Sequence, residues 1–102
     1  MNENMIDLRN WSFVHIPFLW YAPFDNDAGV RLCGNVYGHP KHDDGVTVVT
    51  SRVKNISPMD GYVAIQTENS LYRISKETVS KQYEQAFPDV YEKIIGGYIS
   101  RV

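Results

Sequence analysis

The sequence has little cysteine, no long apolar run and no leader-like segment. Its single cysteine, Cys33, excludes an internal disulfide, a thiolate zinc cluster and a CxxC redox pair. No apolar run approaches the ~20 residues that a membrane-spanning helix needs, and residues 1–9 are too polar for a signal peptide. We therefore expect a cytoplasmic protein that acts without a membrane.

Charge of one sign and recognised catalytic motifs are also missing. The 102 residues include 10 basic and 12 acidic side chains, which are interspersed and give a formal net charge of −2. Because neutralising phosphates requires a basic surface, nucleic acid is not the expected partner. The sequence has no nucleophile elbow, phosphate-binding loop, dinucleotide turn or HExxH motif. These absences favour a protein that is not an enzyme.

What the chain does contain predicts one folded domain. Apolar residues make up 43% and charged residues 22% of a length that suits a single hydrophobic core. We expect three consecutive parts within it: a flexible arm or short helical turn over residues 1–10, strands over 11–74, and a helical segment over 75–100. Strands followed by helices, without alternation of the two, indicate an α+β fold.

Alternation of apolar and polar residues predicts the strands. Val30, Leu32 and Val36 share one face of a strand, on which Gly34 marks a bulge or a close backbone approach. A shift in the alternation within residues 46–53 predicts a β-bulge. The expected strands are 11–16, a short continuation at 18–24 beyond a bend at Pro17, 30–37, 46–53, 62–67 and 70–74. Together they predict a five-stranded, antiparallel, strongly coiled sheet or an SH3-like small barrel.

The C-terminal quarter changes to helical spacing. Ser75 is a good N-cap residue, and Pro88 predicts either a kink or a break into two helices. We expect Asp89 to cap the second helix and Gly96 and Gly97 to end it. The apolar stripe that would lie across the sheet consists of Val79, Tyr83, Ala86, Phe87, Val90, Ile94 and Tyr98.

A dense block of aromatic residues near the N-terminus is the first candidate site. Large aromatic side chains dominate protein interfaces, and both faces of an alternating strand cannot enter one core. The alternative is that most of these rings simply fill the core. The candidate partner-binding residues are Trp11, Phe18, Trp20, Tyr21 and Phe24. The simplest partner would be a second copy of the chain, so a homodimer is expected, with another protein as the alternative.

The polar loop between residues 38 and 45 is the second candidate site. His39, His42, Asp43 and Asp44 could bind a metal ion such as zinc, iron or manganese, with distant His15 as a further ligand. The competing interpretation is a solvated connection between strands, with a turn at its end. Apart from this metal ion, no cofactor is expected.

Two stretches carry a resemblance to a group of proteins. The segment GNVYGHPKHDDG at 34–45 and the segment QTENSLYRI at 66–74 resemble short hypothetical proteins of bacterial mobile DNA, of the prophage or integron gene-cassette type. The resemblance spans about the middle third of the chain. It implies a bacterial cytoplasmic origin and implies no activity.

Three functions follow from these observations. The leading hypothesis is a non-enzymatic binding or adaptor protein that acts through a protein partner or through self-association by the aromatic block. The second is a small metal-dependent or ligand-binding enzyme centred on the histidines and aspartates of the 38–45 loop. The third is a small-barrel nucleic-acid binder whose aromatic side chains stack on bases.

Overall fold

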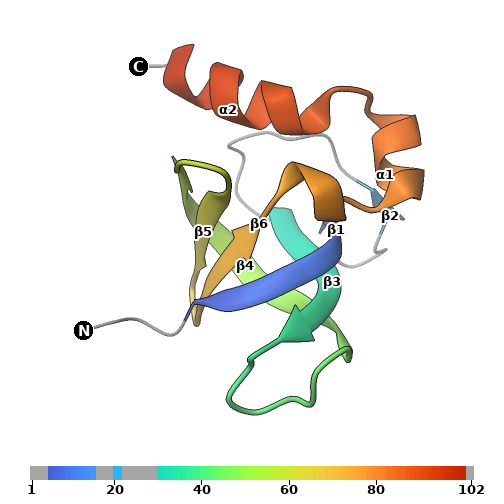
Figure 1. The fold of residues 1–102 in the computed structure, drawn as a ribbon, viewed down its shortest axis with the longest axis vertical. Helices are drawn as coiled ribbons and strands as arrows, with labels where there is room; N and C mark the ends of the chain where they lie inside the picture. Colours follow the sequence, from blue (N-terminus) through green and yellow to red (C-terminus); the bar gives the residue numbers. More distant parts are fainter. Residues whose placement is uncertain (1–4, 16–19, 22–29, 101–102) are drawn as a thin grey trace.

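The computed structural model describes residues 5–15, 20–21 and 30–100, and for residues 15, 20, 21 and 96–100 it describes the backbone alone. Within these residues, strands are followed by a 3-10 turn and two helices (Figure 1). The elements are β1 (Ile6–His15), β2 (Trp20–Tyr21), β3 (Val30–Tyr37), β4 (Thr47–Pro58), β5 (Val63–Thr67), β6 (Leu71–Ile74), η1 (Lys76–Thr78), α1 (Lys81–Ala86) and α2 (Val90–Ser100). The predicted α+β class is confirmed.

Five of the strands form a closed ring. The order is β1-β3-β4-β5-β6, and β6 then pairs with β1. Successive strands pair in antiparallel fashion, but the closing pair is parallel, with Ile6 beside Tyr72 and Asp7 beside Arg73. The predicted five-stranded antiparallel sheet is therefore confirmed for its four successive pairs, and the closing pair is the exception. The reason is parity, because an odd number of strands joined antiparallel leaves the first and last running in the same direction.

The first strand begins earlier than predicted. Ile6 and Leu8 are buried, whereas Asp7 is half-buried and Arg9 is exposed, so a period-two pattern already starts in the segment assigned to an arm. The prediction of an arm over residues 1–10 is thus wrong for residues 6–10, which belong to β1. The register with β3 shifts between Arg9 and Ser12, and Asn10 at this bulge has a positive φ of 55°.

The short strand β2 reverses direction instead of continuing β1. Tyr21 lies opposite Val14, and Trp20 lies opposite His15, in antiparallel pairs. The predicted continuation through residues 18–24 is therefore wrong at its described part, because the chain has turned back on itself. The flanking parts of that prediction, including Phe18 and Phe24, lie outside the described residues.

The strands β3 and β4 confirm the predicted pattern of faces and the predicted bulge. A Cβ atom at Gly34 would lie 2.8 Å from the main-chain oxygen of Arg9, so the predicted close approach of two backbones is present. The β3–β4 register shifts between Arg31 and Cys33. At this shift the main-chain N–H of Leu32 donates to Thr50 Oγ1 at 3.1 Å, which satisfies a buried donor that the ladder leaves unpaired.

The helical segment confirms the break but corrects its ends. Ser75 makes no side-chain capping bond, whereas Ser80 Oγ accepts from the N–H of Tyr83 and caps α1. The helices separate at Pro88, as predicted. Asp89 has a φ of 64°, so it does not have the extended backbone of an N-cap. The predicted stop at Gly96 and Gly97 is wrong, because α2 runs through both to Ser100.

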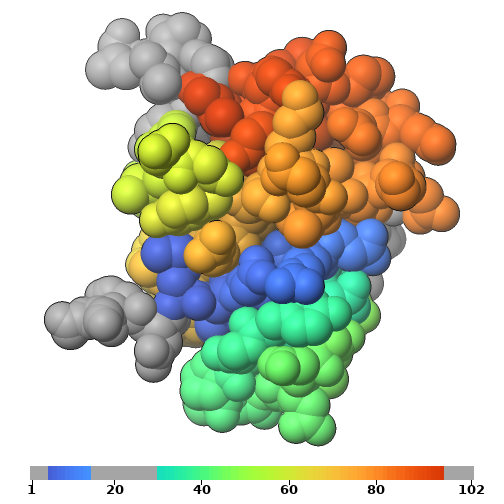
Figure 2. All heavy atoms as spheres, viewed as in Figure 1, coloured from blue at the N-terminus to red at the C-terminus, as the bar shows by residue number. Residues whose placement is uncertain are grey.

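The core lies inside the ring and under the helices. Trp11, Phe13 and Tyr83 are fully buried and pack edge to face or tilted, with ring centroids 6.0–6.3 Å apart. Val90 and Ile94 of α2 belong to the same apolar cluster. The helices therefore close one end of the ring, while the β3–β4 loop projects at the other end (Figures 1 and 2). No helix in the described ranges is both long enough and apolar enough to cross a bilayer.

Candidate functional site

The end of the ring away from the helices contains a cavity of about 510 Å³. Its walls come from the β3–β4 loop, the first half of β4, and the turn that leads from β5 into β6. We call it the polar mouth, and its polar lining residues are His39, Lys41, His42, Thr50, Ser51, Asn69, Ser70 and Tyr72. Its volume falls in the range that small-molecule sites occupy.

The β3–β4 loop is held in a defined shape by main-chain and carboxylate contacts. The N–H of Gly45 donates to the Val36 carbonyl at 2.7 Å, which closes the loop at its base. Gly38 has a φ of 79°, and its N–H donates to Asp44 Oδ1 at 2.9 Å. Because a positive φ favours glycine, the sequence permits a tight turn at this position. These bonds hold the backbone of the loop that carries His39 and His42 in one conformation.

The two histidines of the loop lie beside each other. Their ring centroids are 4.5 Å apart, and the main-chain N–H of Lys41 donates to His39 Nδ1 at 2.9 Å. In the neutral ring this bond places the proton on Nε2, so that nitrogen is a donor. Partial burial, followed by the positive charges of His42 and Lys41, lowers the pKa of His39. The loop thus concentrates basic groups on one wall of the polar mouth.

Another part of the cavity wall is held together by hydrogen bonds between the β5–β6 turn and β4. The N–H of Asn69 donates to Ser51 Oγ at 3.1 Å, and the N–H of Glu68 donates to the Arg52 carbonyl at 3.0 Å. Deeper in the wall, the Ser70 side chain hydrogen-bonds the Tyr72 phenol. Burial raises the pKa of Tyr72, so this phenol stays protonated at neutral pH.

The predicted metal site does not form as expected. His39 and His42 line the polar mouth, but Asp43 and Asp44 are exposed and are not among its lining residues. Within the described part of the chain, no three His, Cys, Asp or Glu side chains come together to hold a metal ion. The side chain of His15, the proposed further ligand, lies outside the described residues. Within the loop, the carboxylate of Asp44 instead accepts a hydrogen bond from the N–H of Gly38.

The predicted aromatic contact surface is also corrected at its first residue. Trp11 is 0% exposed, and its indole ring packs against Phe13, Tyr83 and Tyr91. It therefore belongs to the core, as the alternative interpretation of the aromatic block held. For Trp20 and Tyr21 only the backbone is described, and Phe18 and Phe24 lie outside the described residues.

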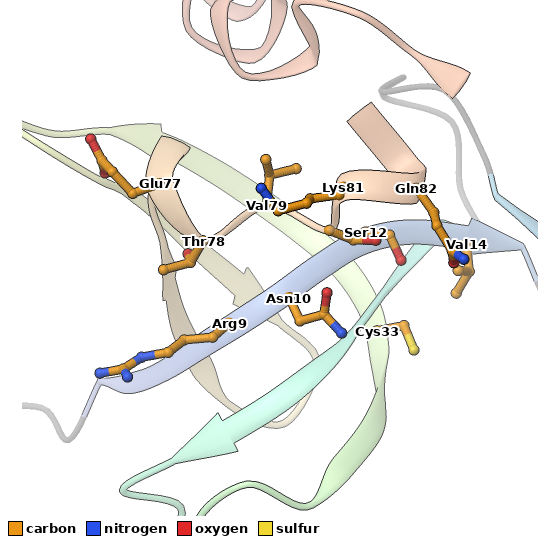
Figure 3. A pocket seen from close by; sticks show the side chains of 11 residues that line it. Arg9, Asn10, Ser12, Val14, Cys33, Glu77, Thr78, Val79, Lys81 and Gln82 are labelled. Carbon is orange, nitrogen blue, oxygen red and sulfur yellow. The ribbon is translucent and has the colours of Figure 1, made fainter. Parts of the chain in front are cut away.

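A second hollow, of about 600 Å³, opens beside the bulge of β1. Figure 3 shows Asn10, Ser12 and Cys33 close together on β1 and β3, while the charged ends of Arg9 and Glu77 point away from them. Burial raises the pKa of the Cys33 thiol, which disfavours the reactive thiolate. The described residues that line this hollow carry charges of both signs, so they do not favour a ligand of one charge.

The sequence pointed to His39 and His42 but missed the groups that face them. Ser51, Asn69, Ser70 and Tyr72 come from distant segments, and only closure of the ring brings them to the same cavity. No local signal in the sequence announces that meeting. Comparison with known proteins finds no matching family model, no matching curated protein and no matching solved structure.

Proposed function

We propose that this protein is a small, non-catalytic binding domain, built on an SH3-like barrel, whose ligand enters the polar mouth. One observation carries the proposal: residues whose side-chain donors the fold does not use line a cavity of ligand size. Lys41 and His42 are among these lining residues, and neither side chain has a hydrogen-bond partner among the described residues. Vacant donors in a recess are the usual means by which a pocket orients a polar ligand.

The hydroxyl groups beside the histidines support binding over catalysis. Ser51 Oγ accepts from the Asn69 N–H, and Thr50 Oγ1 accepts from the Leu32 N–H. A nucleophile needs a base that removes its proton; His39 Nδ1 already accepts from the Lys41 N–H, and among the described residues neither hydroxyl is hydrogen-bonded to the ring of His42. These groups therefore serve as fixed hydrogen-bonding sites.

A protein partner has less support among the described residues. Trp11, the central anchor of the predicted contact surface, is enclosed by its own chain. Among the described side chains, the large apolar ones that are exposed are Val46, Val49 and Met59, at 40%, 38% and 49%. Single exposed apolar residues of this kind are normal on a protein surface and do not require a partner.

An amide chemical-shift screen tests the proposed function. We expect compounds from a mixed library of neutral, cationic and anionic fragments to shift the amides of residues 38–45 and 68–71. Asn69→Trp places a large ring at the cavity and should abolish these shifts. Glu68→Trp is the matched control, because it puts the same ring on the same turn at a residue that does not line the cavity. Shifts that appear elsewhere, or that survive Asn69→Trp, would reject the polar mouth as the site.

A further inference from the structure

We propose that the ligand of the polar mouth is a small phosphorylated molecule, whose phosphate group is held by His39, Lys41 and His42 on one wall and by Ser51 and Asn69 on the other. This inference rests on the proposed function, because it names the chemistry of the ligand for the same cavity. It follows from the charge of the lining, the number of donors and the charge around the cavity.

The lining is positive. Three basic side chains lie within four consecutive residues of the β3–β4 loop, and none of the described residues that line the cavity carries a carboxylate. Partial burial, followed by the positive charges of His42 and Lys41, lowers the pKa of His39. An anion bound beside His39 would oppose both effects and would favour its protonated form. The basic wall is therefore suited to a negatively charged group.

The donors exceed what a carboxylate can use. Ser51 Oγ accepts from the Asn69 N–H with one lone pair, and its O–H donor remains available to an anion. The Asn69 side-chain amide has two further N–H groups, and Ser51 and Asn69 line the same cavity as the histidines. A phosphate monoester offers three terminal oxygens that can accept from both walls, whereas a carboxylate offers two in one plane.

The surroundings of the cavity favour a compact anion over a nucleic-acid strand. Asp43 and Asp44 are exposed on the same loop as the histidines, and Glu68 is exposed on the facing turn. A strand that crossed the cavity would carry further phosphates past these carboxylates, and the chain as a whole has a net charge of −2. A single phosphate that enters the recess meets the basic wall and leaves the carboxylates in solvent.

The test compares ribose 5-phosphate with ribose, which differ only in the phosphate, and adds two further probes. Ribose 5-phosphate, ribose, acetate and a twelve-residue oligothymidylate are each titrated into the full chain, and amide shifts at residues 38–45 and 68–71 are followed. We expect ribose 5-phosphate to shift these amides, and ribose to leave them unchanged. Lys41→Gln should weaken binding of ribose 5-phosphate about fivefold, as expected for one partly solvated charge pair. Lys54→Gln is the matched control for net charge, since this exposed residue does not line the cavity, and should change affinity by less than about twofold.

A further variant isolates the histidine. His39→Asn keeps an acceptor for the Lys41 N–H but cannot become charged, so a spectrum that is otherwise unchanged together with weaker binding would support the proposal. Unchanged affinity in both His39→Asn and Lys41→Gln would overturn it.

The remaining outcomes separate this inference from the function on which it rests. Equal shifts by ribose and ribose 5-phosphate, or equal affinity for acetate, would overturn the phosphate proposal and leave the polar mouth as a binding site. Tighter, salt-sensitive binding of the oligonucleotide would overturn the small-molecule proposal. Absence of shifts with all four probes, alongside a positive fragment screen, would also overturn it, whereas a negative screen would reject the proposed function itself.

Discussion

The indole Nε1 of Trp11 donates to the main-chain carbonyl of Ser75 at 2.9 Å, across 64 positions of sequence. The carbonyl of Trp11 in turn accepts from the N–H of Ser80 at 2.9 Å. One residue of β1 thus holds both ends of the turn that leads from the ring into the helices. Because this segment fixes Tyr83 over the core, Trp11 connects the ring to the helices that close it.

Substitution Trp11→Phe should lower the free energy of unfolding by about 1–3 kcal/mol. It removes the indole donor from the part-buried Ser75 carbonyl, which then accepts only from the N–H and hydroxyl of Thr78, and it leaves space where the larger ring was. Urea unfolding followed by circular dichroism measures the change. Tyr37→Phe, at a half-buried ring on the outer face of β3, is the control and should stay within about 0.5 kcal/mol. Equal stability of the two variants would contradict the structural role of the indole N–H.

Substitution Gly34→Ala should be destabilising by about 1–3 kcal/mol. The new Cβ would lie 2.8 Å from the Arg9 main-chain oxygen and 3.0 Å from Leu8 Cγ, and neither neighbour can move without disturbing β1 or the core. Cys33→Ala, at the next position of β3, adds no atom to this contact and should cost less than about 1 kcal/mol. A stabilised Gly34→Ala variant would mean that β1 and β3 do not approach so closely.

Substitution Thr50→Val tests the bulge between β3 and β4. Valine matches the shape of threonine but offers no acceptor, so the buried N–H of Leu32 loses its partner, at a cost of about 1–3 kcal/mol. Hydrogen exchange of the Leu32 amide should accelerate in parallel. Thr47→Val removes a hydroxyl that accepts from Asn35 Nδ2 at an exposed position, where water can replace it, and should cost about 0.5 kcal/mol or less. Similar losses in the two variants would argue against the buried bond.

Alkaline conditions should destabilise the protein through Tyr83. Desolvation raises the pKa of this buried phenol, with a smaller opposing effect from its hydrogen bond to the Phe13 backbone. The unfolded phenol ionises near pH 10, while the folded one stays protonated. Its contribution to stability is therefore complete below pH 10 and falls as the pH rises above that value. Unfolding measured from pH 9 to 11.5 should show this loss, and Tyr83→Phe should reduce its slope. An unchanged slope would assign the loss to other groups.

Local sequence patterns predicted the elements whose neighbours lie close in the chain. The alternation over residues 30–37 and the hairpin around Glu68 and Asn69 depend on adjacent residues, and both were predicted correctly. The start of β1 was missed because Asp7 and Arg9 make the segment polar in composition, although Ile6 and Leu8 alternate with them. Ser80 replaced Ser75 as the cap of α1 because the parallel bridge of Trp11 to Val79 holds Val79 extended, which separates the 3-10 turn η1 from the helix that follows.

Only the part of the candidate site that lies on the β3–β4 loop could be predicted from the sequence. Sequence proximity identified His39 and His42 as a concentrated polar group, and their ligand chemistry suggested a metal. The chemistry of the site depends on the residues that line the cavity with these histidines. Ser51 and Asn69 reach the cavity through the register of β4 with β5 and the closure of the ring. Ring closure is a property of five strands together, so no window of the sequence contains it.

Because Ile6 of β1 pairs with Tyr72 of β6, the ring can close only after β6 has been synthesised. The first strand can pair with β3 as soon as that strand emerges, but its other edge meets β6 only after the remaining strands have been synthesised. At about 5–20 residues per second, this edge stays open for several seconds. During that time an uncovered edge can recruit strands from other nascent chains. Slower translation between β3 and β6 should therefore reduce the yield of folded protein more than an equal delay after β6.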